Sequence, residues 1–263
     1  MSMLSLLADG LSVFYMGHSL VSPTLPTMMQ DLLHAPVEYQ VINGAPLQWQ
    51  WEHSAEAQGQ DGRRWLPEHR LDALVLTERV PIASTIEYHD SGTYALDWVE
   101  LARKTSPDLQ SYLYQTWDDI DDAGTGSAQA WRDRILTDLP LWQGIVDHVN
   151  AGLPAEAKPM QLIPAGLGMV SLYDAIAQDR VPGASTIRDF FRDNVHPTDA
   201  GFYYVAMIHY AMLTGESPVG LPRQLDGEWG PYPAVPADQA KALQELAQQV
   251  VTDFRAGKLP PRP

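Results

Sequence analysis

The architecture of the chain is indicated first by the stretch Val13-Phe14-Tyr15-Met16-Gly17-His18-Ser19-Leu20. The residues from Leu11 to Met16 form a short apolar run, typical of a buried strand, and Gly17 ends it. Ser19 follows at once, and from Leu25 to Leu33 apolar residues recur at helical spacing. A strand that turns directly into a helix predicts the first βα unit of a parallel sheet.

Strands and helices are expected to alternate along the rest of the chain. The sequence predicts further strands at 37–42, 71–76, 109–116 and 160–163, and helices at 94–103, 128–149, 169–178, 199–214 and 237–256. The alternation predicts an α/β fold in three layers, α/β/α, with a parallel sheet of about five strands. Since no linker is visible, we expect one domain over residues 1–258 and a disordered tail at 259–263.

Composition limits the partners of the chain. Its 33 Asp and Glu residues against 17 Lys and Arg give a formal net charge of −16. Such a chain lacks the basic face of nucleic-acid binders and of proteins held on anionic lipid, and its charge disfavours anionic substrates. Its apolar runs are too short to cross a bilayer. We therefore predict no nucleic-acid partner and no membrane span; the oligomeric state stays open.

The chain has no cysteine, which excludes disulfides, thiolate zinc sites and a cysteine nucleophile. A reduced cytosol and a disulfide-free secreted enzyme both fit, with a periplasmic or secreted location preferred, and removal of a signal peptide stays open. We expect no metal and no cofactor, because the histidines lack ligand spacing. The Asp-rich segment 117–124 lacks the ligand pattern of a calcium loop and is expected to be solvated.

A second segment, Asp193-Asn194-Val195-His196-Pro197, places an acid three residues before a histidine. A serine nucleophile needs a base that takes its proton and a third group that orients the base. Ser19, His196 and Asp193 supply these three types. The alternatives are a helix-capping role for Ser19 and an ordinary surface loop around His196.

Together these segments resemble the SGNH, or GDSL-like, hydrolase superfamily over most of the chain. Gly17-His18-Ser19-Leu20 is similar to the block that supplies the family's serine, with histidine where aspartate or asparagine is usual. Asn43-Gly44-Ala45-Pro46 is similar to the second block, and the segment from Asp193 to His196 is similar to the last. The resemblance implies a flavodoxin-like fold and an esterase that needs no cofactor.

The resemblance also implies roles for single residues. Ser19 would attack an ester carbonyl, His196 would act as base and Asp193 would orient it. The backbone N–H groups of Ser19 and Gly44 would bind the oxyanion.

The third block departs from the family pattern. The strand at 71–76 leads into Thr77-Glu78-Arg79, where the family has an asparagine donor, and the chain is similar there to an esterase-like branch with Gln or Glu. An ionised glutamate accepts hydrogen bonds but donates none. We therefore expect Glu78 to line the site without being an ionised neighbour of the oxyanion, an ion pair with Arg79 being one alternative. Gln115, at the end of the fourth strand, is the candidate for the missing donor.

Three further residues are candidates for substrate binding. His18 is expected either to hold substrate, to contact Glu78, or simply to pack at the turn. Trp49 and Trp117 follow strands, and an aromatic wall there suits a sugar ring or an acyl group, core packing being the alternative. The expected activity is hydrolysis of a small acyl ester, with carbohydrate as a candidate alcohol. An acyltransferase to a sugar hydroxyl and a catalytically impaired binding module are the alternatives.

Overall fold

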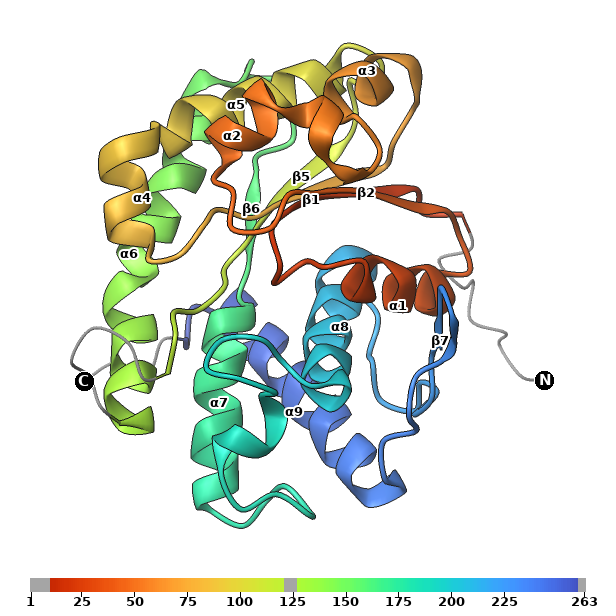
Figure 1. Ribbon diagram of the computed structural model, residues 1–263, viewed down its shortest axis with the longest axis vertical. Coiled ribbons are helices and arrows are strands. Elements are labelled where there is room, and N and C mark those ends of the chain that lie inside the picture. Colours follow the sequence, from red (N-terminus) through yellow and green to blue (C-terminus); the bar gives the residue numbers. More distant parts are fainter. Residues whose placement is uncertain (1–9, 121–126, 260–263) are drawn as a thin grey trace.

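The computed structural model describes residues 10–120 and 127–259. A central sheet lies between two layers of helices (Figure 1). Its strands follow the order β3-β2-β1-β4-β5-β6, and each pairs in parallel with its neighbour except β3, which is antiparallel to β2. The strands are β1 (Val13–Gly17), β2 (Val37–Val41), β3 (Gln58–Gly59), β4 (Ala73–Leu76), β5 (Gln110–Tyr114) and β6 (Gln161–Ile163). The predicted three-layer α/β fold with five parallel strands is confirmed, and β3 adds a short edge.

Two groups of helices cover the sheet (Figure 1). One face carries α1 (Thr24–Leu33), α7 (Ala165–Ala177), α8 (Asp199–Thr214) and α9 (Ala237–Arg255). The other carries α2 (Leu47–Glu52), α3 (Gly62–Trp65), α4 (Ile82–His89) and α5 (Ser91–Arg103). The long α6 (Ala128–Gly152) packs against both α5 and α7. The short α2, α3 and α4 were not predicted, and neither was the small hairpin of β7 (Asp226–Gly227) and β8 (Gly230–Pro231).

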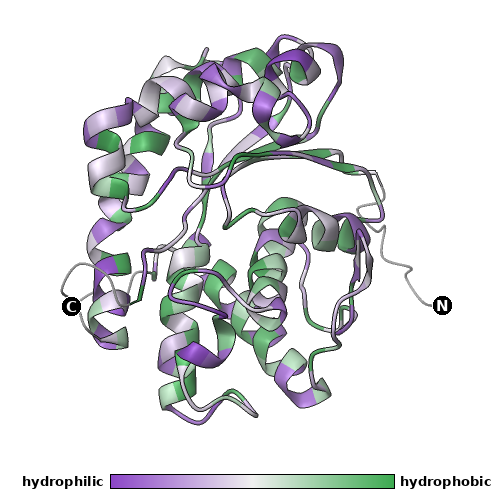
Figure 2. Cartoon of the chain, viewed as in Figure 1, coloured by the Kyte–Doolittle hydropathy of each residue, from purple (hydrophilic) through white to green (hydrophobic). Residues whose placement is uncertain are grey.

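Strand β1 is buried on both faces. Val13 and Tyr15 belong to the core on the α1 and α8 side, whereas Phe14 and Met16 belong to the core on the α5 side. Successive side chains of a strand point to opposite faces, so a strand inside a three-layer sandwich must be apolar throughout. Figure 2 shows the same pattern, with hydrophobic residues along the strands and hydrophilic residues on the outer helix surfaces.

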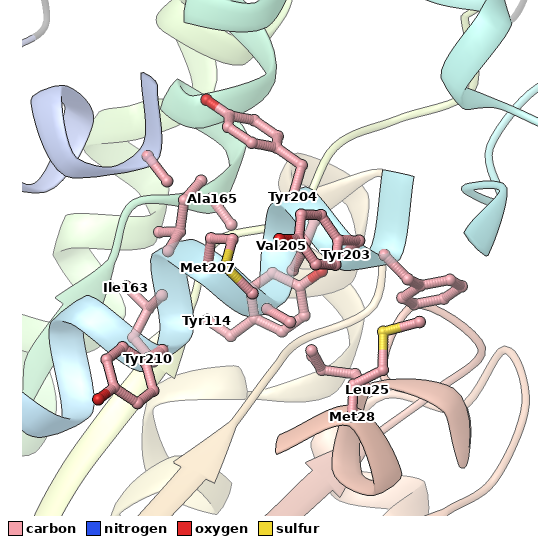
Figure 3. Close-up of a cluster of buried hydrophobic side chains, with 14 of the residues drawn as sticks. Leu25, Met28, Tyr114, Ile163, Ala165, Tyr203, Tyr204, Val205, Met207 and Tyr210 are labelled. Carbon is pink, nitrogen blue, oxygen red and sulfur yellow. The ribbon is translucent and has the colours of Figure 1, made fainter. Parts of the chain in front are cut away.

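Helix α8 fills the centre of the larger core. Its residues from Gly201 to Met212 are all buried, and its side chains meet those of α1 and β5 (Figure 3). His209 lies there with Nδ1 3.1 Å from the Tyr15 hydroxyl, and burial lowers the pKa of His209 to about 3. It is therefore a neutral core histidine.

Three expectations concern segments at the limits of the described chain. Within the described ranges, no helix is both long and apolar enough to cross a membrane. Half of the Asp-rich segment, at 121–124, and most of the tail, at 260–263, lie outside the described residues.

Candidate active site

The sheet topology brings the candidate residues together at the carboxyl ends of the central strands. Strand β1 lies between β2 and β4, and the chain leaves it toward β2 first and then returns past it to β4. In such sheets, the carboxyl ends of the strands at the point of reversal form a crevice that binds ligands. Ser19 follows β1, Gly44 follows β2 and Glu78 follows β4, so all three lie at this point.

The serine, the histidine and the aspartate are hydrogen-bonded in a row. His196 Nε2 lies 2.8 Å from Ser19 Oγ, and His196 Nδ1 lies 2.8 Å from Asp193 Oδ2. A carboxylate accepts hydrogen bonds, so Nδ1 carries the proton and donates to Asp193. Nε2 is then free to accept the Ser19 proton, which is the state that a general base needs.

Asp193 is held as an ionised acid. Its Oδ1 accepts the backbone N–H groups of Val195 at 2.9 Å and His196 at 2.7 Å. Partial desolvation raises the pKa of Asp193, but these N–H groups and the His196 ring outweigh it and lower the pKa to about 2. The neighbouring Asp189 instead accepts the N–H groups of Ser185 and Thr186 and caps a short helical turn.

Trp117 supports the loop that carries the base. Its Nε1–H donates to the Val195 carbonyl at 2.9 Å, and its ring lies edge-on between Tyr114 and Phe191. The side chain is 1% exposed. The expectation that Trp117 forms a wall for substrate is therefore wrong, because the ring turns into the core and its N–H holds the loop.

The turn that carries Ser19 is tightly built. Gly17 leaves no room for a Cβ atom, because the side chains of Thr77 and Val21 occupy that space. The N–H groups of Val21 and Ser22 both donate to the His18 carbonyl, at 2.9 and 3.0 Å. Helix α1 begins only after this turn, so Ser19 lies on the turn and is no N-cap.

Two backbone N–H groups are available beside the serine. Neither the Ser19 N–H nor the Gly44 N–H donates to a protein acceptor among residues 10–120 and 127–259. Both residues line one cavity, and Gly44 has a φ of +68°, a conformation that favours glycine. Free N–H groups next to a nucleophile are the donors that an oxyanion requires.

The cavity at Ser19 has a volume of about 350 Å³. Of the predicted site residues, His18, Ser19, Gly44 and His196 line it. The other lining residues of the cavity are Leu20, Arg79, Val80, Pro81, Asp118, Asp119 and Val195. Five of them follow β4 or β5 by three to five residues, so they too lie at the carboxyl ends of the strands.

Glu78 is fully buried and does not line the cavity, contrary to expectation. Its Oε1 accepts the N–H groups of Leu47 at 3.0 Å and Arg79 at 2.7 Å. Burial raises the pKa of Glu78, against the opposing effect of the Arg79 N–H, the Ser91 hydroxyl and the Leu47 N–H. The carboxyl group thus fastens the loop after β2 to the end of β4. The alternative of an ion pair with Arg79 is wrong, since no carboxylate of the described chain lies within 4.0 Å of that guanidinium.

His18 packs at the turn and joins β1 to β4. Its Nε2–H donates to the Glu78 carbonyl at 2.9 Å, and its Nδ1 accepts the Leu20 N–H at 3.4 Å. Burial lowers the pKa of His18 to about 4, so the ring is neutral at pH 7.

Gln115 and Trp49 lie outside the cavity. Gln115 is buried, and its Oε1 accepts the Leu167 N–H at 3.2 Å in the first turn of α7. Trp49 is 46% exposed on α2 and stacks on His53 with ring centroids 3.6 Å apart. Neither residue has the expected role at the cavity, because one side chain caps a helix and the other covers a surface.

Gln50 is a supporting residue that sequence reasoning missed. Its Nε2 donates to the carbonyl groups of Gly17 at 2.6 Å and Ile42 at 3.2 Å, and its Oε1 accepts from Gln40 at 2.9 Å. These bonds join the ends of β1 and β2, one residue before the Ser19 turn and the Gly44 turn begin. The helix that carries Gln50 was not predicted, so no signal marked it.

No protein-family model and no curated protein matches the sequence. The fold is similar to that of a DUF4886 family protein from Bacteroides uniformis, with a TM-score of 0.63, 14% identity, and 93% of this chain and 95% of that chain covered. It is also similar to the YxiM protein from Bacillus subtilis, with a TM-score of 0.50, 14% identity, and 79% of this chain and 57% of that chain covered. At this identity the likeness concerns the fold alone.

Proposed function

We propose that this protein is a serine esterase of the SGNH type that hydrolyses the ester of a small acyl group. The observation that carries the proposal is the 2.8 Å contact between Ser19 Oγ and His196 Nε2, with Asp193 on the other ring nitrogen. The similarity of the sequence blocks to that superfamily and the cavity beside Ser19 support it. The tryptophans that favoured a carbohydrate do not line the cavity, so the alcohol is left unassigned.

The mechanism follows from the protonation states. His196 Nε2 takes the Ser19 proton as Oγ attacks the ester carbonyl, and Asp193 stabilises the imidazolium that forms. The N–H groups of Ser19 and Gly44 bind the oxyanion. As the tetrahedral intermediate collapses, the imidazolium gives its proton to the leaving alcohol, and the acyl group stays on Ser19. A water molecule, activated by His196, then releases the acid.

The missing third donor bears on the rate. Because the Glu78 carboxyl group accepts two N–H groups and does not line the cavity, it neither donates to the oxyanion nor repels it at contact distance. Removing one oxyanion donor costs about 10²–10³ in kcat in a studied serine protease. The proposed esterase works with two backbone donors and is expected to be correspondingly slower than an enzyme with three.

The test is covalent labelling of the serine together with turnover. Incubation with a fluorophosphonate should add its mass to the peptide that contains Ser19, and the protein should hydrolyse a short-chain aryl ester. Ser19→Ala should lose both properties, while Ser22→Ala, on the same turn, should keep both. Labelling without hydrolysis, but with acyl transfer to an added sugar, would favour the acyltransferase. An unlabelled, inactive but folded protein would favour the binding module.

A further inference from the structure

An arginine, Arg79, lines the cavity beside Ser19. Among the described residues around this cavity, Arg79 alone carries a permanent positive charge. Its backbone N–H is fixed by the Glu78 carboxyl group at 2.7 Å, and its Nε–H reaches the Thr85 hydroxyl at 3.4 Å. The residue is partly buried, so its position at the cavity is built into the fold.

Within the described residues, the positive charge of Arg79 has no carboxylate partner. No Asp or Glu of the described chain lies within 4.0 Å of the Arg79 guanidinium. The contrast with neighbouring arginines is clear, since Arg132 pairs with Asp174 at 2.6 Å and Arg134 lies 3.6 Å from Asp118. In a chain with 33 acidic residues, an unpaired arginine at a cavity points to a ligand that supplies the counter-charge.

The other polar groups of the cavity leave Arg79 as the group that can bind an anion: neither aspartate pairs with Arg79 within 4.0 Å, and His18 adds no second positive charge. Asp118 is engaged by Arg134, and Asp119 has a partner of its own. His18 is neutral, because its Nδ1 accepts a hydrogen bond from Leu20. The remaining wall is largely apolar, with Leu20, Val80, Pro81 and Val195.

We propose that the substrate of the esterase carries an anionic group, and that Arg79 binds this group while Ser19 attacks the ester. This inference rests on the proposed function. A guanidinium binds a carboxylate through two parallel hydrogen bonds, which fix the orientation of the ligand as well as its charge. A cavity of about 350 Å³ suits a small ligand. The substrate class is thus a short anionic ester, with the carboxylate on either the acyl or the alcohol part.

The net charge of −16 does not oppose this assignment at the cavity. Repulsion between the protein and an anion acts at long range and is screened over about 8 Å at physiological ionic strength. A direct contact in a partly buried site is screened much less. The overall charge therefore slows the approach of the ligand, whereas Arg79 determines which ligand is held.

Paired substrates test the specificity. Monoethyl succinate and ethyl butanoate differ by a carboxylate in place of a methyl group on the acyl part, and acetoxyacetate and ethyl acetate differ in the same way on the alcohol part. Wild-type protein should prefer the anionic member of one pair, measured as kcat/KM by acid release. Arg79→Gln should lower that preference by about 10–100-fold, the loss expected for a hydrogen bond to a charged group. Arg79→Lys should fall between, and Arg63→Gln, at an exposed arginine outside the cavity, should leave the preference unchanged.

Binding to the inactive protein separates this inference from the proposed function. Ser19→Ala should bind the preferred anionic ester in calorimetry, and Ser19→Ala with Arg79→Gln should bind it about 10–100-fold more weakly. If this loss is seen while wild-type protein hydrolyses no ester, the esterase is wrong and the anion site stands. If neutral and anionic esters are hydrolysed alike, or if Arg79→Gln slows both members of a pair equally, the esterase stands and the anion site is wrong.

Discussion

The Gln50 side-chain amide donates to the Gly17 carbonyl oxygen at 2.6 Å, and the same nitrogen reaches the Ile42 carbonyl. Gly17 ends the strand before Ser19, and Ile42 precedes the turn at Gly44. One amide thus fixes the spacing between the two backbone segments that we assign to the oxyanion. Gln50 is a positioning residue, because it does not line the cavity.

We predict that Gln50→Met lowers kcat/KM about tenfold or more, because small displacements of reacting groups are costly. Loss of the buried hydrogen bonds should lower the free energy of unfolding by about 1–3 kcal/mol, measured by urea denaturation. Gln48→Met, on the same helix but bonded to Glu52 and His89 and to neither oxyanion segment, should leave kcat/KM unchanged. Equal activity of the two variants would show that Gln50 does not position the site.

Asp193→Asn should lower kcat by about 10³–10⁴-fold without unfolding the protein, because an amide no longer fixes the His196 tautomer. Asp189→Asn is the matched control, since that carboxylate caps a helical turn and does not contact His196. It should keep most of the activity. The reverse order of the two effects would assign the acid to Asp189.

Glu78→Gln should leave kcat/KM equal or higher and raise the melting temperature at pH 7. The amide oxygen still accepts the Leu47 and Arg79 N–H groups, and the substitution removes a carboxyl whose pKa burial raises. Stability that depends on a raised carboxyl pKa is lost as pH rises through that pKa, so the gain should grow with pH.

Glu78→Leu tests whether the Glu78 carboxyl group fastens the loop after β2 to the end of β4, because leucine cannot accept the Leu47 and Arg79 N–H groups. It leaves two buried N–H groups without their acceptor, each worth about 1–3 kcal/mol, so the melting temperature should fall markedly. A loss of kcat/KM beyond a hundredfold in Glu78→Gln, at unchanged melting temperature, would make Glu78 a catalytic residue.

Acid should destabilise the fold through its buried histidines. Burial lowers the pKa of His209 to about 3 and that of His18 to about 4, against an ordinary value of about 6.5. Between these pKa values the two histidines bind protons in the unfolded chain but not in the folded chain. The free energy of unfolding therefore decreases as pH falls from about 6.5 toward 4. Each histidine contributes a slope of about 1.4 kcal/mol per pH unit.

A pair of substitutions isolates one of these protons. His209→Gln should reduce the slope of unfolding free energy against pH by about 1.4 kcal/mol per unit between pH 6 and 4.5. Tyr15→Phe removes the hydrogen bond to the ring but keeps the titrating group, so it should retain the wild-type slope. An unchanged slope in His209→Gln would mean that the ring is not the buried base.

The fold could be predicted because its central strands are short, apolar and separated by long amphipathic helices. The sequence predicts that α7 begins at 169, whereas the helix begins at Ala165, because Gly166 and Gly168 interrupt the apolar pattern. Both glycines are required there, since Gln115 and Ile208 approach the helix too closely for a side chain. The apolar periodicity of the sequence registers that a glycine lacks a side chain, but it does not reveal the neighbouring residue that leaves no room for one.

The candidate site, like the fold, could be predicted from the sequence only in part. Ser19, His196 and Gly44 follow from strand ends and local spacing, and the structure brings them to one cavity. The directions of Trp117 and Gln115 could not be predicted, because a position after a strand does not say whether the side chain turns toward the crevice or the core. The sequence suggests Arg79 only as a partner for Glu78, whereas the structure shows that no carboxylate of the described residues pairs with it.

The position of Ser19, on the turn after the central strand β1, has a consequence for biosynthesis. His196 follows it by 177 residues, and protein synthesis at roughly 5–20 residues per second separates the two by about 10–35 s. During that interval the nascent chain holds a serine without a base, which on the proposed mechanism cannot acylate itself or attack esters in the cell. On the proposed mechanism, hydrolysis therefore becomes possible only after the loop of His196 has been synthesised and has docked against Trp117.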